Sequence, residues 1–207
     1  MLGTDKSLRT EFIKNEMRGK ILDMGCNYGL LHRQIDSKNV IGIDVFVDNY
    51  KERVVQGDVN KMPFKDESFD TLVGGELLEH MKNPDKFLKE CKRVLKKGGK
   101  LIITTPNKKS WLNRLVGSYN ISTEKKPPLN AIFKFASGPE DHYFVVDKKT
   151  LLEKIGKYFK IEKYFCLPYD EISSPHQSKW VYPVRHAVHY LMPEGLQEEQ
   201  VVVAVKE

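Results

Sequence analysis

Glycines and acidic residues follow the first two apolar, β-forming runs of the chain, and their chemistry suits a nucleoside ligand. Residues 23–29 read Asp-Met-Gly-Cys-Asn-Tyr-Gly, a glycine-bearing turn at which the backbone can approach a ligand closely. Nineteen residues beyond Gly25 (44 − 25 = 19), Asp44 ends the second run, where a carboxylate can accept hydrogen bonds from a ribose diol. Together the two features predict a site for an adenosine-containing cofactor.

The same turn does not match the dinucleotide fingerprint G-x-G-x-x-G, because Asn27 stands at its second glycine and Leu30 at its third. NAD and FAD are therefore disfavoured, and a nicotinamide-dependent oxidoreductase is the weaker alternative. Asp23, directly ahead of the turn, can instead face a cationic amino-acid group.

The third and fourth apolar runs end in the same residue types. Asp58 and Val59 follow the third run, where a carboxylate can accept from the adenine amine and a valine can contact the base. Gly74, Gly75 and Glu76 follow the fourth run. Because ligands of open α/β sheets bind at the carboxyl ends of strands, these positions predict one continuous binding rim. The alternative is a set of tight, solvated turns.

Apolar runs alternate with stretches of helical period from residue 20 to residue 107, which is typical of a parallel sheet with crossover helices. The strands expected in this part are residues 20–23, 40–44, 54–57, 69–73 and 101–105. Strands at 159–167 and 200–206 are expected to form an antiparallel terminal pair. The sequence therefore predicts an α/β, Rossmann-like fold, with a mostly parallel seven-stranded sheet, an antiparallel C-terminal strand and helices on both faces.

Two helices have clear start signals. Asn83 is the expected N-cap of the first, and Pro84 suits its first position. The basic pair at residues 96–97 is expected to meet the negative end of this helix, and Gly98 is expected to end it in a left-handed conformation. Asp147 is the expected N-cap of the second helix.

A length of 207 residues with 40% hydrophobic side chains suits one domain, residues 1–207, with 20–107 as its cofactor-binding core. Residues 107–141 and 168–199 lack sustained periodicity and are expected to form lids over the substrate. Residues 107–139 carry six basic side chains against one acidic (6 − 1 = +5), nearly all of the net charge of +6. Such a segment suits an anionic acceptor, a phosphate, RNA or lipid head group, although a solvated lysine face has the same composition.

The three cysteines, Cys26, Cys91 and Cys166, are widely spaced and form no CxxC pair, which argues against a disulfide framework or a zinc ribbon. No apolar run approaches the roughly 18 residues that a membrane span needs. The first seven residues do not resemble a secretory signal. We therefore expect a cytoplasmic protein with no integral membrane association.

The chain resembles the class I S-adenosylmethionine-dependent methyltransferases, and in particular those of the type 11/23 kind. The resemblance rests on ILDMGC at 21–26, GID at 42–44, GDV at 57–59, LLEH at 77–80 and LKKGGKL at 95–101. It implies S-adenosylmethionine as the cofactor, with the turn around the methionine part, Asp44 at the ribose, and Asp58 and Val59 at the adenine. The binding residues it implies are Asp23, Gly25, Cys26, Asn27, Gly29, Asp44, Val45, Asp58, Val59, Gly75 and Glu76. Asn27 departs from the glycine of many members, but asparagine tolerates left-handed backbone.

A helix opening at Glu76 would place Glu76, Glu79 and His80 on one face, at i, i+3 and i+4. Two carboxylates and an imidazole suit a divalent ion such as Mg or Mn, and His142 is the candidate fourth ligand. The set looks like the metal-dependent branch of the family, which includes small-RNA 3′-terminal 2′-O-methyltransferases and ubiquinone-pathway O-methyltransferases. The alternative is a metal-free site, because Leu-Glu-His also occurs in many members that need no metal.

The expected function is methyl transfer from S-adenosylmethionine to a hydroxyl of a small molecule, glycan, lipid or RNA. His80 and His142 are the candidate catalytic residues, because an imidazole beside the acceptor can remove the hydroxyl proton. The alternative is a non-catalytic module of the same fold that binds S-adenosylmethionine or RNA. The residues leave the class of the methyl acceptor open.

Overall fold

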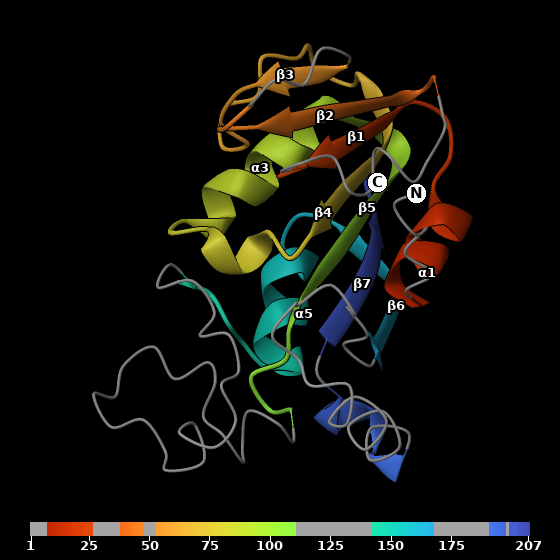
Figure 1. Ribbon diagram of the computed structural model, residues 1–207, viewed down its shortest axis with the longest axis vertical. Helices are drawn as coiled ribbons and strands as arrows, with labels where there is room; N and C mark the ends of the chain where they lie inside the picture. The colour runs from red at the N-terminus through yellow and green to blue at the C-terminus, as the bar shows by residue number, and fades with distance from the viewer. Residues whose placement is uncertain (1–7, 27–37, 48–52, 111–141, 168–190, 198) are drawn as a thin grey trace, which may run out of the picture.

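A seven-stranded sheet forms the centre of the protein (Figure 1). The computed structural model describes residues 8–26, 38–47, 53–110, 142–167, 191–197 and 199–207. The strand order is β3-β2-β1-β4-β5-β7-β6, and β7 runs antiparallel to both of its neighbours. The bounds are β1 Ile21–Met24, β2 Val40–Asp44, β3 Val54–Gln56, β4 Phe69–Gly75, β5 Leu95–Pro106, β6 Lys160–Leu167 and β7 Glu199–Val205. The predicted α/β, mostly parallel fold is confirmed.

The parallel strands β1 to β5 end along one edge of the sheet. Their register pairs Met24 with Ile43, and Asp44 with Gln56. At the end of β4, Gly75 pairs with Thr104 of β5. Residues at the carboxyl ends of these strands therefore share one edge, as the sequence pattern predicted.

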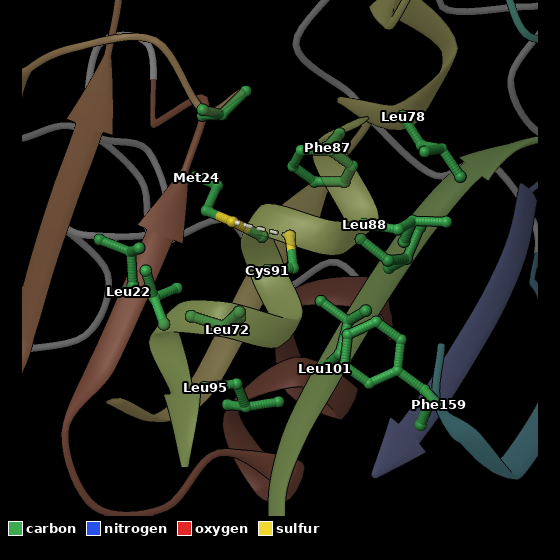
Figure 2. Packing of buried hydrophobic residues seen from close by; sticks show 14 of the residues in the cluster. Leu22, Met24, Leu72, Leu78, Phe87, Leu88, Cys91, Leu95, Leu101 and Phe159 are labelled. Carbon is green, nitrogen blue, oxygen red and sulfur yellow. Dashed lines mark hydrogen bonds between the residues drawn. The ribbon is translucent and has the colours of Figure 1, made fainter. Parts of the chain in front are cut away.

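Helices cover both faces of the sheet, and the alternation of side chains along each strand divides the core in two. Ile21 and Ile102 pack with Ile13 of α1 (Leu8–Glu16) on one face. The larger cluster lies on the other face, beneath α3 (Pro84–Val94) and α5 (Lys148–Gly156). Figure 2 shows its centre, where the Cys91 thiol of α3 contacts the Met24 sulfur of β1 at 3.7 Å. This packing holds α3 against β1 and β4.

The first predicted helix starts where expected but ends earlier. The Asn83 side chain accepts from the Lys86 amide at 3.0 Å, and Pro84 occupies the first turn. The helix ends at Val94, and Gly98, at φ +70°, lies within β5. The prediction that Gly98 stops the helix was therefore wrong. The positive φ of Gly98 occurs where β5 is irregular, because the pairing of β5 with β4 shifts in register between Phe69 and Thr71.

The C-terminal hairpin of β6 and β7 is joined to α1 by ion pairs. Glu16 of α1 accepts from Lys100 of β5 at 2.6 Å and from Lys163 of β6 at 2.5 Å. At the opposite end of β7, Arg9 pairs with Glu199 at 3.3 Å. Glu199 belongs to the strand, so the lid predicted at 168–199 ends before it.

Most of the two predicted lids, residues 111–141 and 168–190, lies outside the described residues. A short 3-10 turn, η3 (Glu194–Leu196), precedes β7. Within the described parts of the chain, no helix is long and apolar enough to cross a membrane. The three cysteines are buried and unpaired by disulfides.

Asp147 caps α5 as predicted, accepting from the Thr150 amide at 3.1 Å and pairing with Lys109 at 2.8 Å. The Lys109 bond, followed by the Thr150 bonds, lowers its pKa to about 2. Because this folded-state pKa lies below the unfolded value of about 4, the carboxylate stabilises the fold above pH 4, and that stabilisation is lost as the pH falls toward 2.

We expect Asp147→Asn, which keeps a capping oxygen but removes the charge, to lower the free energy of unfolding by about 1 kcal/mol at pH 7. The loss should shrink as the pH falls from about 4 to about 2 in urea titrations. Glu153→Gln, which removes an exposed carboxylate from the same helix, is the control. A deficit for Asp147→Asn that is constant with pH would contradict the charge argument.

Candidate functional site

The chain turns sharply where β4 ends. Glu76 has a φ of +49°, which is uncommon for a residue with a side chain. Its amide donates to the Thr104 backbone carbonyl at 3.0 Å, so the end of β5 holds this conformation. A single 3-10 turn, η1 (Leu78–His80), follows. The helix predicted to open at Glu76 is therefore absent from this described corner, and the i, i+3, i+4 argument does not apply to Glu76.

Glu79 is buried at this corner, with 1% of its surface exposed. Its Oε2 accepts from the Thr105 hydroxyl at 2.9 Å, whereas its Oε1 has no hydrogen-bond partner. Burial raises the pKa of this carboxyl well above its ordinary value, although the Thr105 bond opposes the shift. No lysine or arginine of the described residues forms an ion pair with it. The Glu79 carboxyl is therefore stabilised when it takes up a proton or when a cation binds beside it.

The backbone of Glu79 brings His142 into the site. Its carbonyl accepts from the amides of Tyr143 and Phe144, at 2.7 and 2.9 Å. These bonds place His142 beside His80, with their ring centroids 4.7 Å apart and the rings inclined by 72°. Residues separated by 62 positions (142 − 80 = 62) thus face each other at the carboxyl edge of the sheet.

Gln200 of β7 fixes the chain beyond these histidines. It is fully buried, and its amide nitrogen donates to the carbonyls of Val146 at 2.9 Å and Pro106 at 3.1 Å. The Lys108 amide also donates to the Val146 carbonyl, at 3.3 Å. The segment that carries His142 is therefore tied to the ends of two strands.

Three of the four predicted metal ligands form a group. One ligand atom from each of Glu79, His80 and His142 lies within 4.8 Å of the others, a spacing that a single ion can bridge. Glu76 is not a member of this group, but its carboxyl lies near that of Glu79. The predicted candidate catalytic pair, His80 and His142, is part of the same group.

The glycine turn after β1 lies beside this corner. Gly25 has a φ of +66°, and a Cβ there would come within 2.7 Å of Leu77, the residue before η1. Asp23 is 4% exposed at the end of β1. Cys26 is buried against Gly42, and burial, followed by the charges of Asp23 and Asp44, raises its pKa to about 12. The thiol therefore stays protonated at neutral pH. The predicted Asn27 and Gly29 lie outside the described residues.

The ends of β2 and β3 carry the other predicted cofactor residues. The Asp44 Oδ1 accepts from the Phe46 amide at 3.0 Å, and Val45 and Phe46 are exposed by 51% and 83%. Asp58 is exposed; the Asn60 amide bond, more than the charge of Lys86, lowers its pKa. Val59 is 6% exposed and belongs to the core cluster, so most of its surface is already covered.

Comparison with known proteins agrees with this geometry. Residues 22–103 match the family model described as "Methyltransferase domain". A solved S-adenosylmethionine-dependent methyltransferase from Thermotoga maritima, described as a possible histamine N-methyltransferase, superimposes with a TM-score of 0.63 over 96% of this chain and 87% of that one. The match to the family model covers less than half of the chain. At 20% identity, the likeness to the Thermotoga protein concerns the fold.

Relatives in sequence match about half of the chain. A protein of Methanocaldococcus jannaschii with no assigned function is 34% identical over 111 residues, which are 51% of this chain and 49% of the relative. The ubiquinone biosynthesis O-methyltransferase of Coxiella burnetii is 32% identical over 130 residues, 54% of this chain and 56% of the relative. The matched residues span about half the length of these relatives.

Sequence reasoning missed four residues that shape the site: Leu77, Thr104, Thr105 and Gln200. A signal existed for the threonines, because they stand at the carboxyl end of a strand, where polar residues of parallel sheets gather. The contact of Leu77 with the glycine turn and the two bonds of Gln200 depend on tertiary packing, and local sequence gives no sign of them.

Gly25→Ala should destabilise the domain and damage the cofactor turn, because the new methyl group would overlap Leu77 and the residue would need a left-handed backbone. We expect a loss of about 2 kcal/mol or more in the free energy of unfolding, measured with urea. Gly156→Ala, at the end of α5 where a Cβ meets nothing within 4 Å, is the matched control and should be neutral or mildly stabilising. Equal effects of the two substitutions would contradict the packing argument.

Proposed function

We propose that this protein transfers the methyl group of S-adenosylmethionine to a hydroxyl of an acceptor held beside His80 and His142. The observation that carries the proposal is the group of Glu79, His80 and His142 at the same sheet edge as the glycine turn. The ubiquinone-pathway relative, an O-methyltransferase by name, supports oxygen as the acceptor atom. Methyl transfer from a sulfonium needs mainly alignment of donor and acceptor, so a rigid edge with few reactive groups suffices.

The residues at the strand ends fit the cofactor by the chemistry of their donors. Asp44 can accept from the ribose hydroxyls and Asp58 from the adenine amine, while the exposed Val45 and Phe46 offer apolar surface to the base. The positive φ of Gly25 turns the chain at the end of β1, where the methionine part would lie, while the Gly25 and Cys26 amides donate to the Ile43 carbonyl. Asp23 supplies a negative charge for the amino group or the sulfonium. Of the remaining predicted binding positions, Gly75 and Glu76 border the turn into η1.

The same corner fits a divalent cation. Glu79 carries a buried oxygen, Oε1, without a hydrogen-bond partner, and burial raises the pKa of its carboxyl. One carboxylate and two imidazoles suit Mn²⁺ better than Mg²⁺, which prefers oxygen ligands alone. We propose Glu79, His80 and His142 as its ligands, with Glu76 adjacent. A metal there would lower the pKa of an acceptor hydroxyl.

The chain's own residues supply the remaining steps. Thr105 orients Glu79 through its hydroxyl, and the Glu79 carbonyl holds the segment that carries His142. In the absence of a metal, either histidine can accept the hydroxyl proton as the methyl group moves.

A titration of the protein with S-adenosylmethionine and with NAD, followed by calorimetry, tests the cofactor. We expect a micromolar Kd for S-adenosylmethionine and no NAD binding, and Asp44→Asn should weaken the former by about tenfold through loss of ribose contacts. A screen with labelled methyl groups over catechols, sugars, lipid head groups and small RNAs then tests transfer. Binding without transfer to any acceptor would favour a non-catalytic module, and NAD binding in place of S-adenosylmethionine would contradict the proposal.

Mn²⁺ titrated into the protein and followed by electron paramagnetic resonance tests the metal site without reference to activity. We expect binding in the native protein and a loss of at least tenfold in affinity in Glu79→Gln, because the amide keeps the shape but removes the charge. Glu162→Gln, an exposed carboxylate of β6, is the control. Equal Mn²⁺ affinity in Glu79→Gln and the native protein would remove the metal from the proposal, as would full activity in chelator.

A further inference from the structure

An exposed tyrosine and an exposed lysine lie against each other next to the two histidines. Tyr143 directly follows His142 in the chain, and Lys82 comes two residues after His80. The Lys82 ammonium lies 4.9 Å from the centroid of the Tyr143 ring. The segment that carries His80 and Lys82 therefore contacts the segment that carries His142 and Tyr143 twice. One contact is between the two imidazole rings, and the other is between the lysine and the tyrosine ring.

Tyr143 is anchored by its backbone and yet 46% exposed. Its amide donates to the Glu79 carbonyl at 2.7 Å, so the position of the ring is tied to the buried carboxylate of the site. A stacking surface needs this combination, because an anchored aromatic ring loses little conformational freedom when a ligand covers it. Most other rings of the described residues are buried or partly buried, with Phe46 as the more exposed exception.

The charge of Lys82 is available to a ligand. Among the residues that the structure describes, it forms no ion pair within 4.0 Å. Asp85, an acidic side chain three residues further along the chain, pairs instead with Lys154 at 2.7 Å and accepts from Tyr158 at 2.9 Å. Lys86, exposed on the first turn of α3, adds a second positive charge whose field reaches Asp58. Because Lys86 lies near the exposed Asp58, Lys82 is the positive charge on which a ligand at this rim would depend.

We propose that Tyr143 and Lys82 form an acceptor platform that selects methyl acceptors in which a planar ring carries an anionic group. The proposal rests on the function proposed above, because the platform takes its meaning from the reacting hydroxyl near His80 and His142. The ring of the acceptor stacks on Tyr143, and the flexible Lys82 side chain turns from the tyrosine face to the anionic group. A carboxylate on a small aromatic ring and the phosphate of a nucleotide both meet this description.

Two matched pairs of probes separate these sources: catechol with 3,4-dihydroxybenzoate, and uridine with uridine 3′-monophosphate. Their binding is measured by NMR titration of the protein saturated with S-adenosylhomocysteine. In at least one pair, we expect the anionic member to bind at least threefold more tightly than the neutral one. The pair that shows the preference identifies the kind of acceptor.

The variants test each half of the platform. Lys82→Gln should bring the two members of the pair to equal affinity, because only the anionic member uses the charge. Tyr143→Leu should weaken both members at least threefold, whereas Tyr143→Phe should preserve both affinities. Lys97→Gln is the matched control: it removes an exposed lysine at the opposite end of β5, roughly 25 Å from the site at about 3.3 Å per strand residue.

The outcomes separate the platform from the proposed function. A protein that fails to bind S-adenosylhomocysteine contradicts the proposed function itself. Normal S-adenosylhomocysteine binding overturns the platform alone if none of the four probes binds or if neither pair shows a preference. A preference that survives Lys82→Gln, or that Lys97→Gln reduces equally, also overturns it.

Discussion

The backbone carbonyl of Glu79 is the constraint on which the arrangement of the site depends. It accepts two amides, from Tyr143 and Phe144, and so joins the corner after β4 to a segment more than 60 residues away. A hydrogen bond to backbone restricts position more firmly than one between flexible side chains, because fewer torsions separate it from the fold. His80 and His142 face each other for this reason, and neither needs a direct bond to the other to stay in place.

The side chain of the same residue gives this corner an unusual electrostatic environment. A carboxylate that is 1% exposed loses most of its hydration, and the Thr105 hydroxyl replaces only part of it. Glu199, buried nearby, raises the pKa of Glu79 further by its own negative charge, although Arg9 pairs with it. A fold selected for stability alone would gain by replacing such a group with an apolar side chain. Its presence at the carboxyl edge of the sheet fits the role proposed for it, either protonated or beside a cation.

The sequence predicted the features that depend on local patterns. The alternation of apolar runs with helical stretches was sufficient to predict the sheet and the parallel direction of most of its strands. The Asn83 and Asp147 caps could be predicted because they depend on side-chain chemistry within one helical turn. It misplaced Gly98, because a glycine with positive φ can end a helix or serve an irregular strand, and the choice depends on pairing with β4. The turn at Glu76 was missed for a similar reason: Thr104, 28 positions away, stabilises a backbone that the local residues alone disfavour. Residue types thus predicted which groups meet at the edge of the sheet. The geometry of these groups depended on contacts between segments that are far apart in the sequence.

The antiparallel strand β7, which lies next to β5 in the sheet, also holds the site in place. Gln200 belongs to this strand and reaches both Pro106 at the end of β5 and Val146 just before α5. An amide can satisfy two carbonyls at once, which a hydroxyl or a carboxylate cannot do. The His142 segment is therefore held at one end by Glu79 and at the other by Gln200 and the Asp147 cap. Because these anchors belong to the sheet and its helices, the histidines and the buried carboxylate keep their geometry independently of the segments expected to cover the substrate. Acceptor choice can then change through exposed residues of the rim, such as Tyr143, without disturbing the groups that carry out the chemistry.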